Sequence, residues 1–303
     1  MSLGTILVTG ATGKQGGSVI SALLAEKAEY KILALTRDAS SPSAKNLAAK
    51  SSGITLVEGN LDDADTVFEN AKKLASSPIW GVFSVQTLTP NKAGPINEER
   101  QGKALIDASV ANGVKFFVYS SVDRGGEARS SDNPTNVPHF ASKHNIERHL
   151  MDQSQMSWTI LRPVAFMENF NGGLIGRIFA SCWQTALPSR PLQLIATSDI
   201  GVFAAKAFMD PDSDRFKGKA ISLAGDELTF EQMSAVFKEK TGSDVPLSWG
   251  FMARVTFYMS EEMSTMFNFF EKEGYGADIQ ELRKIHPGLK TLGAWLPESP
   301  YAK

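Results

Sequence analysis

The sequence predicts an α/β fold with a doubly wound parallel sheet and a smaller C-terminal α+β subdomain. Apolar, β-branched strands alternate with helical segments along the first half of the chain, as is typical of a parallel sheet covered by helices. A turn with three spaced glycines follows the first strand and leads into a helix. The length of 303 residues suits either one large α/β unit or a larger domain followed by a smaller one.

We place the domain boundary after residue 163. The first domain is expected at 1–163, with a returning strand near 219–225, and the second at 164–303. Strands are expected at residues 5–8, 30–36, 55–58, 81–85, 115–120 and 158–161. Helices are expected at residues 17–26, 64–74, 97–112, 137–150 and 199–209, and from 229 onward. Loops are expected at residues 90–95 and 123–137, the second of which is long enough to be functional or disordered.

The glycine turn is the clearest chemical signal in the sequence. Gly10 permits a sharp turn after the first strand, and Gly13 lets a phosphate approach the backbone. Gly16 lets the next helix pack close to that strand. The free N–H groups and positive dipole end of the helix favour a pyrophosphate. The stretch therefore predicts a Rossmann-type dinucleotide site, the alternative being a structural turn without a ligand.

The end of the second strand predicts which dinucleotide is bound. Arg37 stands there, and an arginine at this point accommodates the 2′-phosphate of NADP(H). Asp38 follows directly and could instead bind the ribose hydroxyls of NAD. Residues 39–52 lack strong apolar periodicity and are expected to form a mobile loop with at most one helical turn. We hypothesise that this loop becomes ordered when the cofactor binds.

The ends of the next strands should meet at the ligand-binding edge of the sheet. After the third strand, Asn60 and Leu61 are placed to touch adenine, although a plain helix cap at Asp62 or Asp63 fits the same residues. In the helix expected at 137–150, His139 and Lys143 are four residues apart and share one face.

Bulk composition excludes some classes of function. A hydrophobic content of 42% and a charged content of 21% are ordinary for a soluble protein, and the net charge of −2 gives no footprint for nucleic acid. Cys182 is the only cysteine, so no intramolecular disulfide can form, and its apolar surroundings favour an inert buried thiol over a reactive one. We find neither a secretory leader nor an apolar run near the ~18 residues of a membrane span. The cytosol is the expected compartment, with the nucleus left open.

The segment at 250–275 is crowded with methionine and phenylalanine. At helical spacing most of these side chains should belong to the core, although flexible methionines could equally line an adaptable pocket.

Five groups of residues together resemble one protein family. They are Thr9-Gly10-Ala11-Thr12-Gly13-Lys14-Gln15-Gly16-Gly17, Arg37, Pro138-His139-Phe140 with Lys143, Arg162-Pro163 followed by Phe166 and Glu168-Asn169, and Leu292-Gly293-Ala294-Trp295-Leu296. This combination resembles the NmrA-like family of atypical short-chain dehydrogenase/reductases, close to its NADPH-sensor branch. The similarity covers nearly the whole chain and is thin in the loops.

The resemblance implies a Rossmann domain that binds NADP(H), with a smaller C-terminal subdomain. No metal site is expected. The resemblance places the ribose-side lysine of the family on Lys143, the adenine contacts on Asn60 and Leu61, and the segment after Pro163 near the nicotinamide. The sensor branch usually has a more acidic and amide-rich pair where Asn60 and Leu61 stand. The full set of expected cofactor contacts is Gly10, Thr12, Gly13, Lys14, Gln15, Gly16, Arg37, Asn60, Leu61, Val85, Gln86, Thr87, Ser120, Lys143, Pro163, Phe166 and Asn169.

The family contains both reductases and non-catalytic regulators, so chemistry must decide between them. A short-chain reductase uses a tyrosine, whose pKa of about 10 is lowered by the neighbouring lysine, to protonate the carbonyl oxygen. Here His139 stands at the tyrosine position. His139, with a reference pKa of about 6.5, or Tyr119 could replace that donor, or His139 could simply line the pocket. Asp123, Glu168 and His144 are expected in surface or capping roles.

Two functions follow from this reasoning. The favoured one is a redox sensor that reads the NADPH/NADP ratio and acts through a regulatory protein partner. The alternative is an NADPH-dependent oxidoreductase that reduces a small carbonyl, imine or enone compound, with Lys143 and His139 as catalytic residues. The sequence leaves the oligomeric state open, a homodimer being one possibility, and neither nucleic acid nor a membrane is an expected partner.

Overall fold

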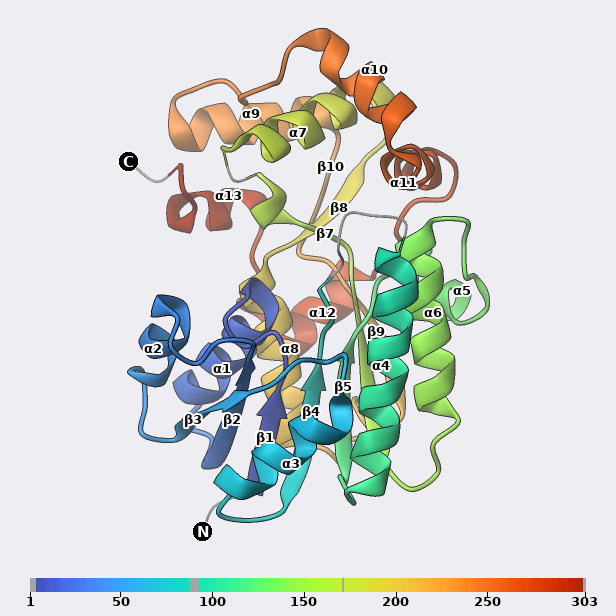
Figure 1. Cartoon of the computed structure of the whole chain (residues 1–303). Helices are drawn as coiled ribbons and strands as arrows, with labels where there is room; N and C mark the ends of the chain where they lie inside the picture. Colours follow the sequence, from blue (N-terminus) through green and yellow to red (C-terminus); the bar gives the residue numbers. More distant parts are fainter. Residues whose placement is uncertain (1–3, 88–92, 171, 302–303) are drawn as a thin grey trace. The chain divides into compact units, whose positions relative to one another are not determined.

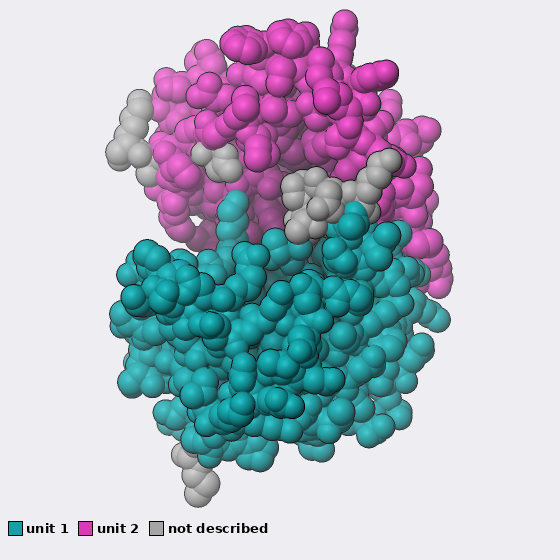
Figure 2. Space-filling view, in the orientation of Figure 1, with its two compact units in different colours: residues 1–121, 141–162, 200–221 teal, residues 122–140, 163–199, 222–303 magenta. Residues whose placement is uncertain are grey.

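The computed structural model describes residues 4–87, 93–170 and 172–301 (Figure 1). The chain divides into two compact units, coloured separately in Figure 2. Unit 1 comprises residues 1–121, 141–162 and 200–221, and unit 2 comprises residues 122–140, 163–199 and 222–303. This division differs from the predicted one, because residues 122–140 and 222–225 group with unit 2 and residues 200–218 group with unit 1.

The larger sheet has seven strands in the order β3-β2-β1-β4-β5-β6-β9. Its strands are β1 (Gly4–Val8), β2 (Tyr30–Thr36), β3 (Ile54–Glu58), β4 (Ile79–Ser84), β5 (Phe116–Ser120), β6 (Ser157–Pro163) and β9 (Lys219–Leu223). The pairs β1–β2, β1–β4, β2–β3, β4–β5 and β5–β6 are parallel. The predicted α/β fold and the strand that returns to the sheet are therefore confirmed.

Helices cover both faces of this sheet (Figure 1). They are α1 (Lys14–Ala25), α2 (Pro42–Ala48), α3 (Ala64–Leu74), α4 (Gly94–Ala111), α6 (Pro138–Met151) and α8 (Thr197–Met209). Buried residues of α3, α4 and α6 form one apolar cluster with the sheet. Helix α8 packs closely on α1, since a Cβ added to Gly201 would lie 2.5 Å from backbone atoms of Ser18. This close packing fixes the start of α1 against the sheet.

Three segments expected to be loops contain helical residues. Residues 42–48 form α2, because Ser41 caps the helix through a bond from the Ala44 N–H at 3.4 Å and Pro42 stands at its first turn. The helical part of residues 39–52 is therefore longer than the single turn expected there. In the loop expected at 90–95, α4 already begins at Gly94, and residues 90–92 lie outside the described residues. Within the expected loop at 123–137, α5 (Glu127–Asp132) forms a short helix.

Unit 2 has a smaller, mixed sheet in the order β10-β8-β7. Its strands are β7 (Ala165–Phe166), β8 (Leu192–Ile195) and β10 (Asp226–Leu228), and β8 pairs parallel with β7 and antiparallel with β10. Its remaining helices are α7 (Leu174–Ala186), α9 (Phe230–Thr241), α10 (Gly250–Met259), α11 (Glu261–Lys272), α12 (Ile279–Ile285) and α13 (Leu292–Trp295), with the short 3-10 turns η1 (Met167–Asn169) and η2 (Leu296–Glu298).

The core of unit 2 is rich in aromatic rings. Phe267 packs edge-on against Phe270, with ring centroids 5.4 Å apart. The expectation of a core role for the methionine- and phenylalanine-rich segment is confirmed for α11, whose Phe267, Phe269 and Phe270 are buried. It is wrong for one face of α10, where Phe251 and Met259 are exposed.

Cys182 is fully buried in unit 2. Burial raises the pKa of its thiol to about 11, so the thiolate that reacts or binds metals is scarce at neutral pH. The prediction of a buried thiol is confirmed. Among the described residues, no helix combines the length and the apolar character needed to cross a bilayer.

Candidate functional site

The turn between β1 and α1 adopts a shape that favours glycine. Gly10 has a φ of +57°, and a Cβ added there would lie 2.8 Å from Cγ1 of Val85. The Gly13 N–H donates to the Gly10 carbonyl at 2.9 Å and closes the turn. Gly13 then forms the N-terminal cap of α1 in an extended conformation, and no side chain caps it.

Gly16 is the most constrained position of this turn. A Cβ there would lie 2.4 Å from the carbonyl oxygen of Gly10 and 2.5 Å from that of Thr9. Both atoms belong to the backbone, so a rotamer change cannot relieve the overlap. Only glycine lets α1 begin this close to the end of β1.

Thr9 ties this turn to the next strand of the sheet. Its hydroxyl donates to the Val85 carbonyl at 2.9 Å and accepts from the Val85 N–H at 2.8 Å. The two bonds hold the C-terminal ends of β1 and β4 together and place Val85 beside Gly10. Sequence reasoning did not single out Thr9 as a site residue, because its partner is 76 residues away.

The start of α1 is open to an anion. Thr12, Gly13 and Lys14 are exposed, and no acidic side chain stands in the first helical turn. Such a helix start attracts negative charge through its N–H groups and dipole. Gln15 accepts a hydrogen bond from the Ser120 hydroxyl at 2.5 Å. This bond joins the C-terminal end of β5 to the first turn of α1.

Arg37 and Asp38 differ in how they are engaged after β2. The Asp38 carboxylate accepts the backbone N–H of Ser40 at 2.8 Å and its hydroxyl at 2.6 Å, and these bonds lower the pKa of Asp38. Arg37 is exposed and forms no hydrogen bond or ion pair with the rest of the described chain. The guanidinium is therefore available to a ligand, whereas Asp38 already accepts two bonds from its own turn.

Asn60 and Leu61 lie in a turn held by its own polar bonds. The Asn60 side chain accepts the Asp62 N–H at 3.2 Å and donates to the Asp62 carboxylate at 2.9 Å. Gln101 and Arg100 of α4 also bind that carboxylate, and these bonds lower the pKa of Asp62. The helix cap falls on Asp63, which accepts the Thr66 N–H at 3.0 Å.

Gln86 carries a buried acceptor without a partner at the end of β4. Its amide nitrogen donates to the Ser84 hydroxyl at 2.9 Å, while its Oε1 accepts no hydrogen bond from the described residues. A buried acceptor in this state costs about 1–3 kcal/mol. A ligand hydroxyl or amide N–H would satisfy it, so the residues at this edge fit a polar ligand. Thr87, the next residue, is exposed.

Lys143 is held by a buried carboxylate that sequence reasoning missed. Its Nζ donates to Oε1 of Glu98 at 2.5 Å, and the Ser142 hydroxyl donates to Oε2 at 2.5 Å. Glu98, on α4, is almost fully buried, and the Lys143 side chain is largely buried too. An ammonium has three N–H donors, so Lys143 can bind Glu98 and still donate to a ligand.

His139 has a carboxylate partner as well. Its Nδ1 contacts Oε1 of Glu262, on the first turn of α11, and its backbone N–H donates to the same atom at 3.4 Å. Both residues belong to unit 2. A carboxylate on one ring nitrogen fixes the orientation of the imidazole.

Three of the residues predicted to contact the cofactor, those expected near its nicotinamide, belong to unit 2. Pro163 ends β6, Phe166 ends β7, and Asn169 ends η1. Between them, Glu168 accepts the N–H of Thr197 at 3.0 Å and its hydroxyl at 2.7 Å, which confirms a capping role at the start of α8.

Two expectations about other polar side chains are wrong. Asp123 is fully buried rather than at the surface, because it accepts the N–H groups of Gly125, Gly126 and Gly276 at 3.0–3.1 Å. Tyr119 is fully buried in the core of the sheet, so it cannot reach a substrate as a proton donor.

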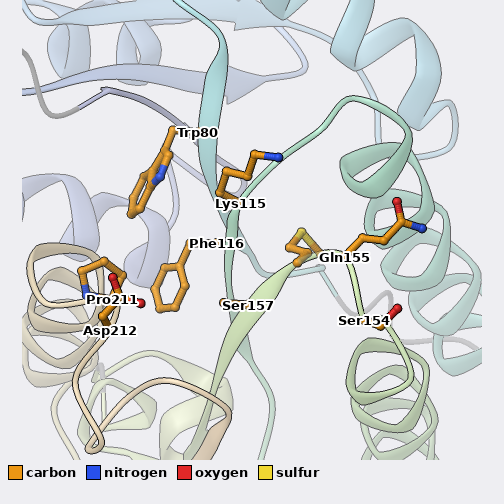
Figure 3. Close-up of a pocket in the computed structure, with 9 residues that line it drawn as sticks. Trp80, Lys115, Phe116, Ser154, Gln155, Ser157, Pro211 and Asp212 are labelled. Atoms are coloured by element: carbon orange, nitrogen blue, oxygen red, sulfur yellow. The ribbon is translucent and has the colours of Figure 1, made fainter.

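A separate pocket lies at the opposite ends of the strands. It has a volume of about 310 Å³ (Figure 3). Its lining includes Phe116 and Ser157, the first residues of β5 and β6, whereas the glycine turn follows the last residue of β1. This pocket is therefore distinct from the candidate dinucleotide site. The lining residues are Trp80, Lys115, Phe116, Ser154, Gln155, Met156, Ser157, Pro211 and Asp212.

Comparison with known proteins gives related sequences and folds. The NmrA-like family domain-containing oxidoreductase cpsB of Aspergillus campestris is 27% identical over 324 residues, covering 97% of this chain and 85% of the relative. Quinone oxidoreductase 2 of Escherichia coli is 24% identical over 241 residues, covering 79% and 76%.

Solved structures share the fold. The NADPH-dependent quinone oxidoreductase QOR2 of Escherichia coli, complexed with NADPH, has a TM-score of 0.70 at 23% identity and covers 97% of this chain and 99% of its own. The negative transcriptional regulator NmrA, in complex with NAD, has a TM-score of 0.70 at 19% identity and covers 97% and 94%. The model of the NmrA-like family matches residues 2–296, and the chain belongs to that family.

Proposed function

We propose that this protein is an NADP(H)-dependent oxidoreductase that reduces small carbonyl, imine or enone compounds. The observation that carries the proposal is the glycine turn, where Gly16 has no room for a side chain and α1 starts without an acidic residue. Relatives named as oxidoreductases, and fold neighbours described with NADPH or NAD, agree with it.

The residues present fit an NADP(H) molecule. The turn from Gly10 to Gly16 would hold the pyrophosphate, and Arg37 would bind the 2′-phosphate. Gln86 offers a buried acceptor to a donor of the ligand. Asn60 and Leu61 would border the adenine, and Lys143 would donate to ribose hydroxyls. Pro163, Phe166 and Asn169 would lie near the nicotinamide.

Bound NADPH would supply a hydride, and the chain must supply a proton and the correct orientation. Lys143 would orient the ribose, with its ammonium fixed by Glu98. His139, oriented by its contact with Glu262, would donate the proton to the substrate oxygen or nitrogen.

The test is an assay of NADPH oxidation against carbonyl and quinone compounds, together with calorimetry of NADPH binding. Saturable turnover that Lys143→Ala abolishes, while the circular dichroism spectrum stays unchanged, supports the proposal. Submillimolar NADPH binding without turnover on any substrate contradicts the catalytic part, and absence of binding at millimolar NADPH contradicts all of it.

A second candidate is a regulator that reads the NADPH/NADP ratio. The replacement of tyrosine by His139 favours it, because a sensor needs the dinucleotide site without the usual proton donor. This role predicts tight NADPH binding without turnover. It also predicts that a protein partner is captured differently when NADPH or NADP⁺ is present.

Arg37→Ala should weaken NADPH binding by at least about 1.5 kcal/mol, the low end for hydrogen bonds to charged groups. NADH lacks the 2′-phosphate, so its affinity should hardly change. Calorimetry with both cofactors measures the difference. Equal losses for NADPH and NADH would show that Arg37 does not recognise the extra phosphate.

Glu98→Gln should lower kcat/KM about tenfold, because the neutral amide no longer fixes the Lys143 ammonium. Glu98→Asp, which keeps the charge but shortens the side chain, should lose less. Steady-state kinetics measures both variants. Glu99→Gln is the matched control, since Glu99 binds Lys103 and Asn145 instead of Lys143. A loss in the control equal to that of Glu98→Gln would mean that helix packing is responsible.

A further inference from the structure

Helix α10 exposes one apolar face in unit 2. Phe251, Val255, Tyr258 and Met259 recur at helical spacing, so they share that face. Tyr258 is 92% exposed and Met259 is 79% exposed. Trp249, 77% exposed, extends the face, and its ring stacks on that of Phe251 with centroids 6.3 Å apart. We call these five residues the α10 face.

The opposite side of α10 is anchored in the core. Ala253 is fully buried, and the Phe257 ring packs against Phe267 at 5.5 Å. The helix is therefore oriented by packing, and exposure of the α10 face follows from that orientation.

The α10 face is large for a surface left in water. At 150–250 Å² for a large aromatic side chain, its three aromatic residues expose roughly 450 Å², and Val255 and Met259 add to this area. The largest apolar patch on a typical monomer is about 300–600 Å². A standard interface buries about 800 Å² on each partner. The face therefore approaches the size of one side of a protein interface.

The charges beside the α10 face suggest its partner. Arg254 lies four residues before Tyr258, and Glu261 lies three residues after it. Neither forms a salt bridge within the described part of the chain. A surface with one cation and one anion on either side of its centre is complementary to a second copy of itself turned through a twofold axis. A bilayer surface fits less well, because interfacial helices usually carry several basic residues.

We propose that the α10 face is a homodimer interface, in which α10 packs antiparallel to α10 of a second copy. The twofold axis passes beside Tyr258, and Arg254 of each copy faces Glu261 of the other. Antiparallel packing also places the positive N-terminal end of each α10 beside the negative C-terminal end of the other. This assembly does not depend on the proposed reaction, because no residue of the α10 face belongs to the candidate dinucleotide site.

Sedimentation velocity of the full chain over roughly 1 to 100 μM tests the proposal, a range that covers weak and moderate dimers. The wild type should dimerise. Tyr258→Asp should raise the dimer Kd at least about tenfold, as expected at the centre of an interface. Ile96→Asp, an equally polar change at an exposed position of α4, should leave the Kd unchanged. A monomeric wild type throughout the range would overturn the proposal, as would an equal effect of Ile96→Asp.

A charge exchange tests the antiparallel arrangement. Arg254→Glu and Glu261→Arg should each weaken the dimer, because each places like charges across the axis. The double variant restores opposite charges and should recover most of the wild-type affinity. A double variant weaker than both single variants would overturn the arrangement. Flotation of a monomeric wild type with anionic vesicles, lost in Tyr258→Asp, would instead assign the α10 face to a membrane surface.

Discussion

Gly16→Ala is expected to lower the affinity for NADPH at least about 100-fold, or roughly 2.7 kcal/mol. The added methyl group would lie 2.4 Å from the Gly10 carbonyl oxygen and 2.6 Å from its carbonyl carbon. Contacts this short with backbone force α1 away from the end of β1. The displaced helix start and turn would no longer present their N–H groups to a pyrophosphate. Calorimetry with NADPH measures the loss.

The control for this variant is Gly53→Ala. A Cβ at Gly53 would meet the Ser51 hydroxyl at 3.4 Å, an ordinary contact, and Gly53 precedes β3 at the opposite end of the strands. Its NADPH affinity should equal that of the wild type. A thermal melt of Gly16→Ala separates lost binding from lost folding. Wild-type affinity in a folded Gly16→Ala variant would exclude the glycine turn as the phosphate site.

The parts of the fold that follow local patterns could be predicted from the sequence. The helix at residues 64–74 was placed at its observed bounds, because an aspartate cap and a regular apolar stripe define both ends. The smaller sheet was not predicted. Its strands β7 and β10 have two and three residues, too few for an apolar period to be recognised.

The polar partners of the candidate site could not be predicted, because they are distant in the sequence. Glu98 binds Lys143 across 45 residues, and Glu262 binds His139 across 123. Neither carboxylate has a local signal that separates it from Glu99 or Glu261 next to it. The glycine turn and Arg37 could be recognised from the sequence, because their chemistry depends on neighbours within one βαβ unit. Local motifs are therefore enough to propose a ligand site, whereas the positions of the polar side chains around that candidate site depend on tertiary pairing.

Arg162→Met should destabilise the protein by about 3–5 kcal/mol, the cost of removing one partner of a buried ion pair. Arg162 on β6 donates to Glu147 on α6 through Nε at 3.1 Å and Nη2 at 2.7 Å, and both side chains are buried. The Ser121 hydroxyl, just after β5, also donates to Glu147. Without the guanidinium, the Glu147 carboxylate would stay in the core with too few hydrogen bonds to replace its hydration. Urea denaturation followed by tryptophan fluorescence measures the free energy of unfolding.

The double variant Arg162→Met/Glu147→Leu separates pairing from packing. Because it removes both charges, it should recover at least half of the stability lost in Arg162→Met. Lys217→Met is the matched control, since Lys217 pairs with Asp212 at 2.6 Å on the surface, and it should change the free energy of unfolding by less than about 1 kcal/mol. A double variant less stable than Arg162→Met would mean that the side-chain shapes, rather than the uncompensated carboxylate, determine the loss. Recovery would instead show that the Arg162–Glu147 pair mainly prevents a lone charge in the core.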